Sequence, residues 1–288
     1  MPSEKSVWLA SSQLGFKRVV FLVTIGITAI LIAKLFSSTV AIVALAYFVL
    51  FLFVLLRELL FAGVYMRLKV FSVGKITYEL RDFLMPMKPS ENLRGIYVMS
   101  TGAISSRLYL RANQRWAYFD KLREFLEQQY IPLQSFLLLG GGGGTVAVTL
   151  ARTYPQAQID VVEISRQFSH LAKHYFLPLL REKNQVSWFT NSAQKFIQRK
   201  EKQYNAVFID IFEGEKIPNS ITTERFLRSA KRRVAPKGVI VFNLGIQAKN
   251  DLAPFLNRLI TIFQALELYW WERNLVAVWH APALKKHE

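Results

Sequence analysis

Two carboxylates and a run of glycines are the residues of this sequence best placed to bind a ligand. Five glycines, Gly140 to Gly144, follow the apolar run "SFLLL" and precede the helical pattern "TVAVTLARTY". Glu163 ends the next apolar run, 23 residues after Gly140, and Asp210 ends a later one. A glycine turn between strand and helix lets the backbone approach a ligand, and an acid about 20 residues later can bind ribose hydroxyls. The spacing therefore predicts a nucleoside pocket. A flexible linker is the alternative for the glycine run, but a linker would be rich in polar residues.

The surrounding segments alternate between strand-like and helix-like patterns from residue 134 onward. Apolar strand patterns occupy residues 135–140, 157–165, 185–190, 204–212 and 236–244, each followed by a helical pattern, and residues 266–272 and 274–282 form a late hairpin pair. Apolar strands that alternate with helices predict a parallel sheet with helices on both faces, an α/β, Rossmann-like domain. In such a sheet, Glu163 and Asp210 both stand at the carboxyl ends of strands, where ligands bind.

Two apolar segments near the N-terminus predict a transmembrane helical hairpin. Residues 19–36 contain one charged residue, Lys34, and residues 39–56 contain none. Each is long enough to cross a hydrocarbon core of about 30 Å. Lys and Arg flank the pair on its outer sides, whereas the turn between the segments has neither. By the positive-inside rule, residues 19–56 lie in a lipid bilayer such as a bacterial inner membrane, with both termini and the main domain cytoplasmic. A buried hairpin in a soluble protein is the alternative.

Residues 66–112 form a connecting region between the apolar hairpin and the α/β domain. Short apolar runs at residues 95–100 and 106–111 indicate strands, so a small β-rich segment is expected there. Residues 115–130 show apolar side chains at three- and four-residue spacing, which indicates a helix. The predicted domains are therefore the hairpin over residues 1–65, the connecting segment over 66–112 and the nucleoside-binding domain over 113–288.

Several motifs of the α/β domain resemble the spermidine synthases, which share the class I S-adenosylmethionine-dependent methyltransferase fold. "LLLGGGGGTVAVTLARTYPQAQIDVVEIS" resembles the family's "GGGDGG" turn and following strand ending in "EID", with no gap between the first glycine and Glu163. "KQYNAVFIDIFEGEKIP", "TTERFLRSAKRRVAPKGVIVFNL" and "YFDKL" resemble further blocks. The resemblance covers roughly residues 103–282. It implies a class I methyltransferase-type sheet for this region.

The resemblance also implies an activity, the transfer of an aminopropyl group from decarboxylated S-adenosylmethionine to a small-molecule amine. A protonated amine must lose a proton before it attacks, and a carboxylate can accept that proton or bind the cation. On the matching positions, the implied catalytic residues are Asp210 as base and Tyr118, which positions the amine, with Asp120 and Glu213 lining the acceptor site. The implied donor-binding residues are Gly140, Gly141, Gly142, Gly144, Glu163 and Ser192.

Three departures from the family pattern leave the reaction open. Gly143, Ser165 and Ser192 each stand where the family has an aspartate. An intact Asp210 and Tyr118 favour aminopropyl transfer. Gly143 favours a methyltransferase that uses S-adenosylmethionine on an unknown acceptor, because it leaves room for the donor's carboxylate. The two serines favour a non-catalytic membrane protein that binds a nucleoside or a partner. If these residues have only structural roles, Asp210 is a helix cap or a solvated group, and Tyr118 packs on its helix.

Composition restricts the remaining function classes. The chain has no cysteine, which excludes disulfides and thiolate metal sites. His170 and His174 stand one helical turn apart without an evident third ligand, so no metal is expected. The net charge of +17 suits an anionic membrane leaflet, and nucleic-acid binding is not expected because no interleaved exposed aromatics are identifiable. The pair Trp270–Trp271 fits a core, a membrane interface or a homodimer face, so a homodimer stays open.

Overall fold

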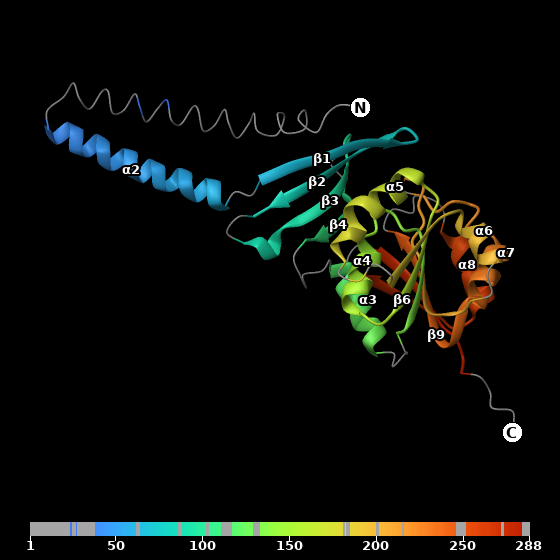
Figure 1. Ribbon diagram of the computed structural model, residues 1–288. Helices are drawn as coiled ribbons and strands as arrows, with labels where there is room; N and C mark the ends of the chain where they lie inside the picture. The colour runs from blue at the N-terminus through green and yellow to red at the C-terminus, as the bar shows by residue number, and fades with distance from the viewer. Residues whose placement is uncertain are drawn as a thin grey trace. The chain divides into compact units, whose positions relative to one another are not determined.

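The computed structural model contains two compact units, Met1–Gln114 and Arg115–Glu288 (Figure 1). Each unit is considered by itself. The residues that the structure describes are 24, 27, 38–61, 64–85, 88–101, 104–110, 117–128, 133–180, 182, 185–199, 202–214, 216–245, 252–271 and 274–283.

The first unit contains a helix followed by a four-stranded antiparallel sheet. The elements are α2 (Ser38–Phe61), β1 (Val64–Val73), β2 (Ile76–Leu84), the 3-10 turn η2 (Pro89–Glu91), β3 (Leu93–Val98) and β4 (Ile104–Tyr109), with the strands in the order β1-β2-β3-β4. β1 and β2 form a hairpin in which Val73 pairs with Ile76, and Gly74 takes a positive φ of 58° in the two-residue turn. The β-rich segment was expected in this region, but only β3 and β4 were anticipated from the sequence.

The structure gives little support to the membrane hairpin that the sequence predicts. Across the described ranges given above, none of the helices is both long enough and apolar enough to span a membrane. α2 is a single helix of 24 residues that contains the predicted second segment, residues 39–56. The predicted first segment, residues 19–36, lies outside the described residues except for Thr24 and Ile27.

The second unit is an α/β domain built on a seven-stranded sheet. Its helices are α3 (Ala117–Gln128), α4 (Thr145–Thr153), α5 (Arg166–Leu171), α6 (Ala193–Arg199), α7 (Glu224–Arg232) and α8 (Ala253–Phe263). α5 continues through a π-helical turn, Ala172–Phe176, and a 3-10 turn, Leu177–Leu179. The strands are β5 (Ser135–Leu139), β6 (Gln158–Glu163), β7 (Val186–Thr190), β8 (Tyr204–Ile209), β9 (Val234–Gly245), β10 (Leu266–Trp271) and β11 (Asn274–His280).

The strand order of this sheet is β10-β11-β9-β8-β5-β6-β7. β5 to β9 are parallel to their neighbours in this set, but β11 runs antiparallel to both β9 and β10. The sheet is therefore mixed, which corrects the expectation of a parallel sheet, because the late hairpin inserts its second strand beside β9. Figure 1 shows α3, α4 and α5 on one face and α6, α7 and α8 on the other. This is a methyltransferase-type, Rossmann-like arrangement.

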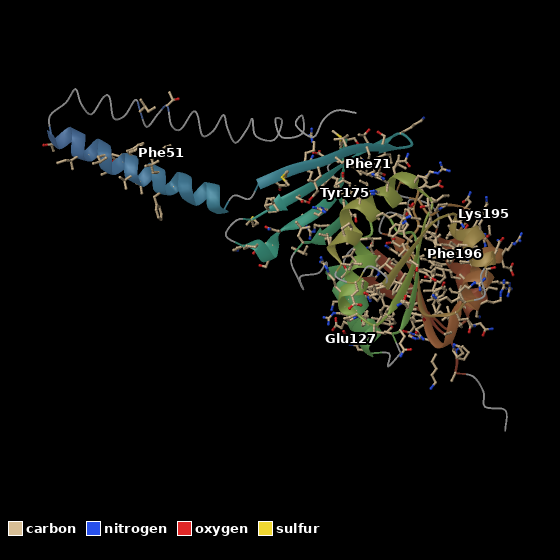
Figure 2. All side chains as sticks on the ribbon, in the orientation of Figure 1. Phe51, Phe71, Glu127, Tyr175, Lys195 and Phe196 are labelled. Carbon is tan, nitrogen blue, oxygen red and sulfur yellow. The ribbon has the colours of Figure 1, made fainter. Side chains whose placement is uncertain are left out.

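Apolar side chains of the central strands form the core that holds this sheet rigid. Leu137, Leu139 and Val207 belong to the buried cluster beneath α6, α7 and α8. The helices follow the expected amphipathic pattern: on α6, Phe196 is buried and its neighbour Lys195 is exposed, as Figure 2 shows. Burial on both faces fixes the register of the central strands, and so fixes where their carboxyl ends lie.

Candidate nucleoside site

The candidate site lies at the carboxyl ends of adjacent parallel strands. β5 is central: the next strands, β6 and β7, lie on one side of it, and β8 and β9 lie on the other, so the strand order reverses at β5. Such a switch point opens a crevice outside the strand ends. Gly140 follows β5, Glu163 ends β6 and Asp210 follows β8. The register therefore brings these three predicted residues to one edge of the sheet.

The glycine loop is packed tightly against its neighbours. Gly140 has a φ of 97°, and a Cβ at this position would collide with the carbonyl oxygen of Asp210. A Cβ on Gly141 would lie 2.6 Å from Val161 Cγ1 and 2.7 Å from the ring of Trp188. At Gly142, by contrast, a Cβ would meet no atom within 4 Å. The first residues of the loop thus pack against the sheet, Gly142 stays open, and Gly144 is the N-cap of α4.

Glu163 is fixed against this loop by backbone donors. Its side chain is buried, and its two carboxylate oxygens accept hydrogen bonds from the N–H of Gly142 at 2.8 Å and the N–H of Ser165 at 2.7 Å. Burial raises the pKa of Glu163, although these backbone bonds act in the opposite direction. Each oxygen of a carboxylate can accept more than one hydrogen bond, so capacity remains for ribose hydroxyls.

Asp210 is held by an amide that sequence reasoning missed. The Asn243 Nδ2 donates to Asp210 Oδ1 at 3.0 Å, while the N–H of Gly245 donates to Asn243 Oδ1 at 3.0 Å and so sets the amide's orientation. Burial raises the pKa of Asp210 to about 6, and the Asn243 bond only partly offsets this. The available signal was the position of Asn243 at the end of a strand that neighbours β8.

The other predicted site residues lie on separate elements. Ser192 follows β7 and donates its N–H to Asn191 Oδ1 at 2.8 Å, at the start of α6. Glu213 lies on the exposed loop after β8, where its backbone pairs with Lys216. Tyr118 and Asp120 lie in the first turn of α3, and their side chains fall outside the described set. The structure therefore brings together the glycine loop, Glu163 and Asp210.

One apolar residue beside the site also escaped sequence reasoning. Ile164 follows Glu163 directly and is 72% exposed, although it is a large hydrophobic side chain. An exposed apolar side chain next to the candidate ribose ligand Glu163 could contact the base of a nucleoside. Its only sequence signal was its place between the acid and Ser165.

The described residues offer no group of three or more His, Asp or Glu that could hold a metal ion. The rings of His170 and His174 stack with centroids 4.0 Å apart, and His174 Nδ1 lies 2.8 Å from the carbonyl oxygen of His170.

Comparison with known proteins gives this edge a family context. Residues 125–253 match the spermine/spermidine synthase domain. A polyamine aminopropyltransferase of Vibrio vulnificus is 34% identical over 113 residues, which cover 38% of this chain and 37% of that protein. Another, of Neisseria meningitidis serogroup B, is 25% identical over 158 residues, covering 54% of this chain and 55% of that protein. The chain thus spans about a third to a half of these relatives.

Solved structures agree on the fold. A probable spermidine synthase from Corynebacterium glutamicum superposes with a TM-score of 0.59 at 20% identity, covering 74% of this chain and 79% of that one. The spermidine synthase from Thermotoga maritima gives a TM-score of 0.52 at 10% identity, with coverage of 74% and 72%. At such identities the likeness concerns the fold. The chain therefore contains a spermidine synthase-like domain, with polyamine aminopropyltransferase homologues, on a methyltransferase-like fold.

Proposed function

We propose that this protein is a transferase that binds a sulfonium nucleoside donor and passes an aminopropyl group to a small amine. The observation that carries the proposal is the arrangement of Asp210, whose pKa is raised to about 6, beside the glycine loop that also holds Glu163. A base whose pKa lies just below neutrality is ionised at pH 7 and can still accept a proton efficiently. The domain match to the spermine/spermidine synthases supports the same reaction class.

The proposed step uses the residues in separate roles. Glu163 accepts hydrogen bonds from the ribose hydroxyls, and the N–H groups of the glycine loop face the donor. The acceptor amine attacks the propyl carbon bound to the sulfonium, the carbon–sulfur bond breaks, and the thioether leaves as methylthioadenosine. The proton lost by the amine passes to a carboxylate oxygen of Asp210. Tyr118, Asp120 and Glu213 are proposed to shape the acceptor side.

A methyltransferase is the second candidate, because the chain has Gly143 where the resembled family has an aspartate. A glycine there removes the negative charge that would repel the carboxylate of S-adenosylmethionine. A Drosophila melanogaster protein named "eEF1A lysine and N-terminal methyltransferase homolog" is 26% identical over 148 residues, covering 48% of this chain and 22% of that protein. A non-catalytic nucleoside-binding role is the third, since Ser165 is used to cap α5 by accepting a bond from the Phe168 N–H.

The donor experiment separates these candidates. Calorimetry on the full chain in detergent would compare S-adenosylmethionine, its decarboxylated form and methylthioadenosine. Tight binding of the decarboxylated donor, with release of methylthioadenosine when diamines are added, is the expected result. Binding of S-adenosylmethionine alone, with release of S-adenosylhomocysteine, would replace aminopropyl transfer by methyl transfer. If none of the three nucleosides bound, both transferase candidates would be rejected.

Donor binding has a matched control pair. Glu163→Gln replaces a carboxylate oxygen by an amide N–H that would face a backbone donor, so nucleoside affinity should fall about tenfold or more. Glu213→Gln alters an exposed acid on the proposed acceptor side and should leave nucleoside affinity nearly unchanged. Equal losses in the two variants would argue against a ribose role for Glu163.

Membrane attachment is a separate proposal that rests on the apolar pattern of residues 19–36 and 39–56. In α2, the exposed side chains include Ile42, Leu45, Leu50 and Phe53, and such a surface is unfavourable in water. We propose that this helix contacts lipid. Fractionation after alkaline carbonate extraction should leave the full chain in the membrane pellet. Complete release into the supernatant would contradict the proposal and leave the nucleoside site unaffected.

A further inference from the structure

We propose that Trp188 is a positioning residue of the candidate nucleoside site, whose indole supports the glycine loop and so keeps the Gly142 N–H on Glu163. The ring acts through the loop and does not itself contact the donor or the acceptor. The inference deepens the proposed donor site, and it rests on the proposed function for one consequence, that donor affinity depends on this indole.

The last four glycines of the loop form a closed turn. The N–H of Gly144 donates to the carbonyl oxygen of Gly141 at 2.9 Å, the hydrogen bond of a β-turn. Inside the turn, the N–H of Gly142 donates to Glu163 Oε2 at 2.8 Å. Because its own hydrogen bond closes the turn, its two ends are tied together. The support under Gly141 and Gly144 therefore decides where the Gly142 N–H lies.

The indole of Trp188 lies against both ends of this turn. A Cβ built on Gly141 would lie 2.7 Å from the indole Cη2 and 2.8 Å from Cζ2, and one built on Gly144 would lie 3.6 Å from Cζ3. These three atoms form the outer edge of the six-membered ring. Val161, which pairs with Trp188 across β6 and β7, adds its Cγ1 at 2.6 Å from the Gly141 position. The turn thus rests on one indole and one valine.

The strand order explains why this support needs a long side chain. The loop follows β5, whereas Trp188 belongs to β7 at the end of the sheet, with β6 between them. Neighbouring strands lie about 4.8 Å apart, so the side chain has to reach over roughly two such spacings. The two fused rings of tryptophan extend further than the single ring of phenylalanine. A phenylalanine at residue 188 should therefore lose the contact with Gly141.

The indole nitrogen indicates that apolar contacts place this ring. Trp188 is half-buried, and its Nε1 is shielded from solvent and finds no hydrogen-bond partner among the residues that the structure describes. A shielded N–H without a partner is unfavourable for folding. Replacing the indole by a benzene ring removes this donor, which offsets part of the apolar contact that is lost. Trp188→Phe is therefore expected to change loop support more than overall stability.

Loss of this support should reach Glu163. Burial raises the pKa of Glu163, and hydrogen bonds from backbone N–H groups, those of Gly142 and Gly141 among them, act against that rise. A turn that moves off the indole withdraws these two donors. Glu163 is then less often ionised and less firmly oriented, so it becomes a weaker acceptor for ribose hydroxyls.

Hydrogen exchange tests the positioning role without any ligand. The chain has 14 glycines, so selective ¹⁵N-glycine labelling of the full chain in detergent gives a small set of amide signals. Trp188→Phe should speed exchange of the Gly142 N–H at least about tenfold, because its opening becomes local and frequent. The N–H of Gly140, which donates to the Val162 carbonyl oxygen at 2.9 Å, is the reference within the same loop and should change less than about twofold. Equal changes at both glycines, or none at Gly142, would overturn the proposal.

Donor binding has a control with the same substitution. Trp188→Phe should weaken methylthioadenosine binding about fivefold, the size expected for a residue that acts on a ligand through its neighbours. The KM for the donor should rise by a similar factor while kcat changes less than about twofold, because Asn243 still holds Asp210. Trp279→Phe alters a buried indole that packs on Phe263, with ring centroids 5.4 Å apart, and should leave nucleoside affinity unchanged. Equal losses of affinity in the two variants would contradict the assignment.

A double-variant cycle shows whether Trp188 acts through Glu163. In a Glu163→Gln background, Trp188→Phe should weaken methylthioadenosine binding less than about twofold further, because the contact that it disturbs is already impaired. Fully additive losses would overturn the proposed route. If Trp188→Phe does not fold, as judged by its melting curve, Trp188→Tyr serves instead, since it also has a single ring. A wild-type chain that binds no nucleoside would reject the proposed transferase, whereas the exchange rates would still support or overturn the positioning of the loop by Trp188.

Discussion

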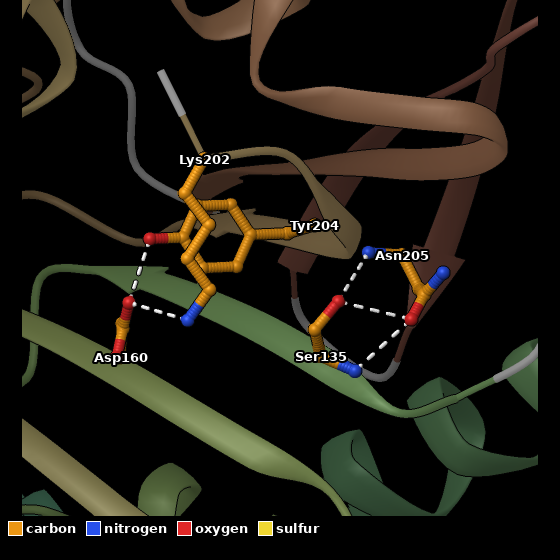
Figure 3. A network of polar contacts seen from close by, with 5 residues as sticks. All are labelled: Ser135, Asp160, Lys202, Tyr204 and Asn205. Atoms are coloured by element: carbon orange, nitrogen blue, oxygen red, sulfur yellow. Dashed lines mark hydrogen bonds and ion pairs between the residues drawn. The ribbon is translucent and has the colours of Figure 1, made fainter. Parts of the chain in front are cut away.

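The two edges of the seven-stranded sheet treat their polar groups differently. Toward the amino ends of the strands, Asp160 accepts hydrogen bonds from Tyr204 Oη at 2.7 Å and Lys202 Nζ at 3.0 Å (Figure 3). Beside them, Asn205 Oδ1 accepts bonds from the N–H and the hydroxyl of Ser135 at 3.0 and 2.9 Å. These polar groups satisfy one another, so this edge contributes stability.

The carboxyl edge shows the opposite arrangement. Asp210 is a partly buried acid whose pKa is raised, and its side chain accepts a hydrogen bond from a neutral amide, that of Asn243. Gly140 adopts a left-handed φ that leaves no space for a side chain. Buried charge and special backbone geometry reduce stability, and they cluster where a ligand later compensates for them. The difference supports the proposal that the chemistry takes place at the carboxyl edge, while the amino edge stabilises the sheet.

The largest expected effect tests the chemistry of the carboxyl edge. Asp210→Asn should lower turnover about 100- to 10,000-fold while nucleoside affinity changes little, because the amide cannot accept the proton. In the wild-type protein, turnover should rise as the pH increases through about 6, the pKa of Asp210. Steady-state rates across pH, with calorimetry for binding, measure both. Unchanged turnover in the variant would show that Asp210 is not the base.

Next in size is a backbone change in the glycine loop. Gly140→Ala should destabilise the protein by about 3 kcal/mol or more, because the new Cβ collides with the Asp210 carbonyl and the φ is unfavourable. Gly142→Ala is the matched control: it also has a positive φ, 48°, but its Cβ meets open space, so about 1 kcal/mol is expected. Urea unfolding of both variants gives the comparison. Similar losses would mean that contact with Asp210 does not matter.

The carboxyl edge should also cost stability in a pH-dependent way. Folding raises the pKa of Asp210 from 3.8 to about 6. The free energy of unfolding therefore falls as the pH rises between these values, because the carboxyl ionises first in the unfolded state. The cost is then constant at higher pH, at up to about 3 kcal/mol. Asp210→Asn should remove this fall, so that the variant is more stable than wild type at pH 7. Parallel stability curves from pH 4 to 8 would contradict the raised pKa.

The smallest of these effects concerns the amino edge. Tyr204→Phe removes a donor to the buried carboxylate of Asp160 and should cost about 1.5–3 kcal/mol. Burial raises the pKa of Tyr204, so the hydroxyl stays protonated and keeps donating over the working pH range. Melting curves measure the loss, and nucleoside calorimetry should show unchanged affinity. A clear fall in nucleoside affinity would break the division of roles between the two edges.

Sequence reasoning could find the site because its main signals are local. The glycine run, the apolar strands and the distance from Gly140 to Glu163 follow from period and spacing alone. It could not find Asn243, since a strand-end amide becomes meaningful only when β9 is known to lie beside β8. The hairpin of β1 and β2 also escaped, because charged residues such as Arg67, Lys69 and Arg81 interrupt its alternation. Arg67 pairs with Glu79 across the hairpin, and sequence order does not reveal that partner.

The contact between Trp188 and the glycine loop gives the protein an internal optical reporter. Cβ atoms built on Gly141 and Gly144 would lie 2.7 and 3.6 Å from the indole, so this ring is close to both ends of the loop. The indole Nε1 is shielded from solvent and finds no hydrogen-bond partner among the described residues. Any loop movement that admits water or a ligand would change the emission wavelength of this indole. Fluorescence of a variant that retains only Trp188 would therefore follow loop motion in real time without an added label.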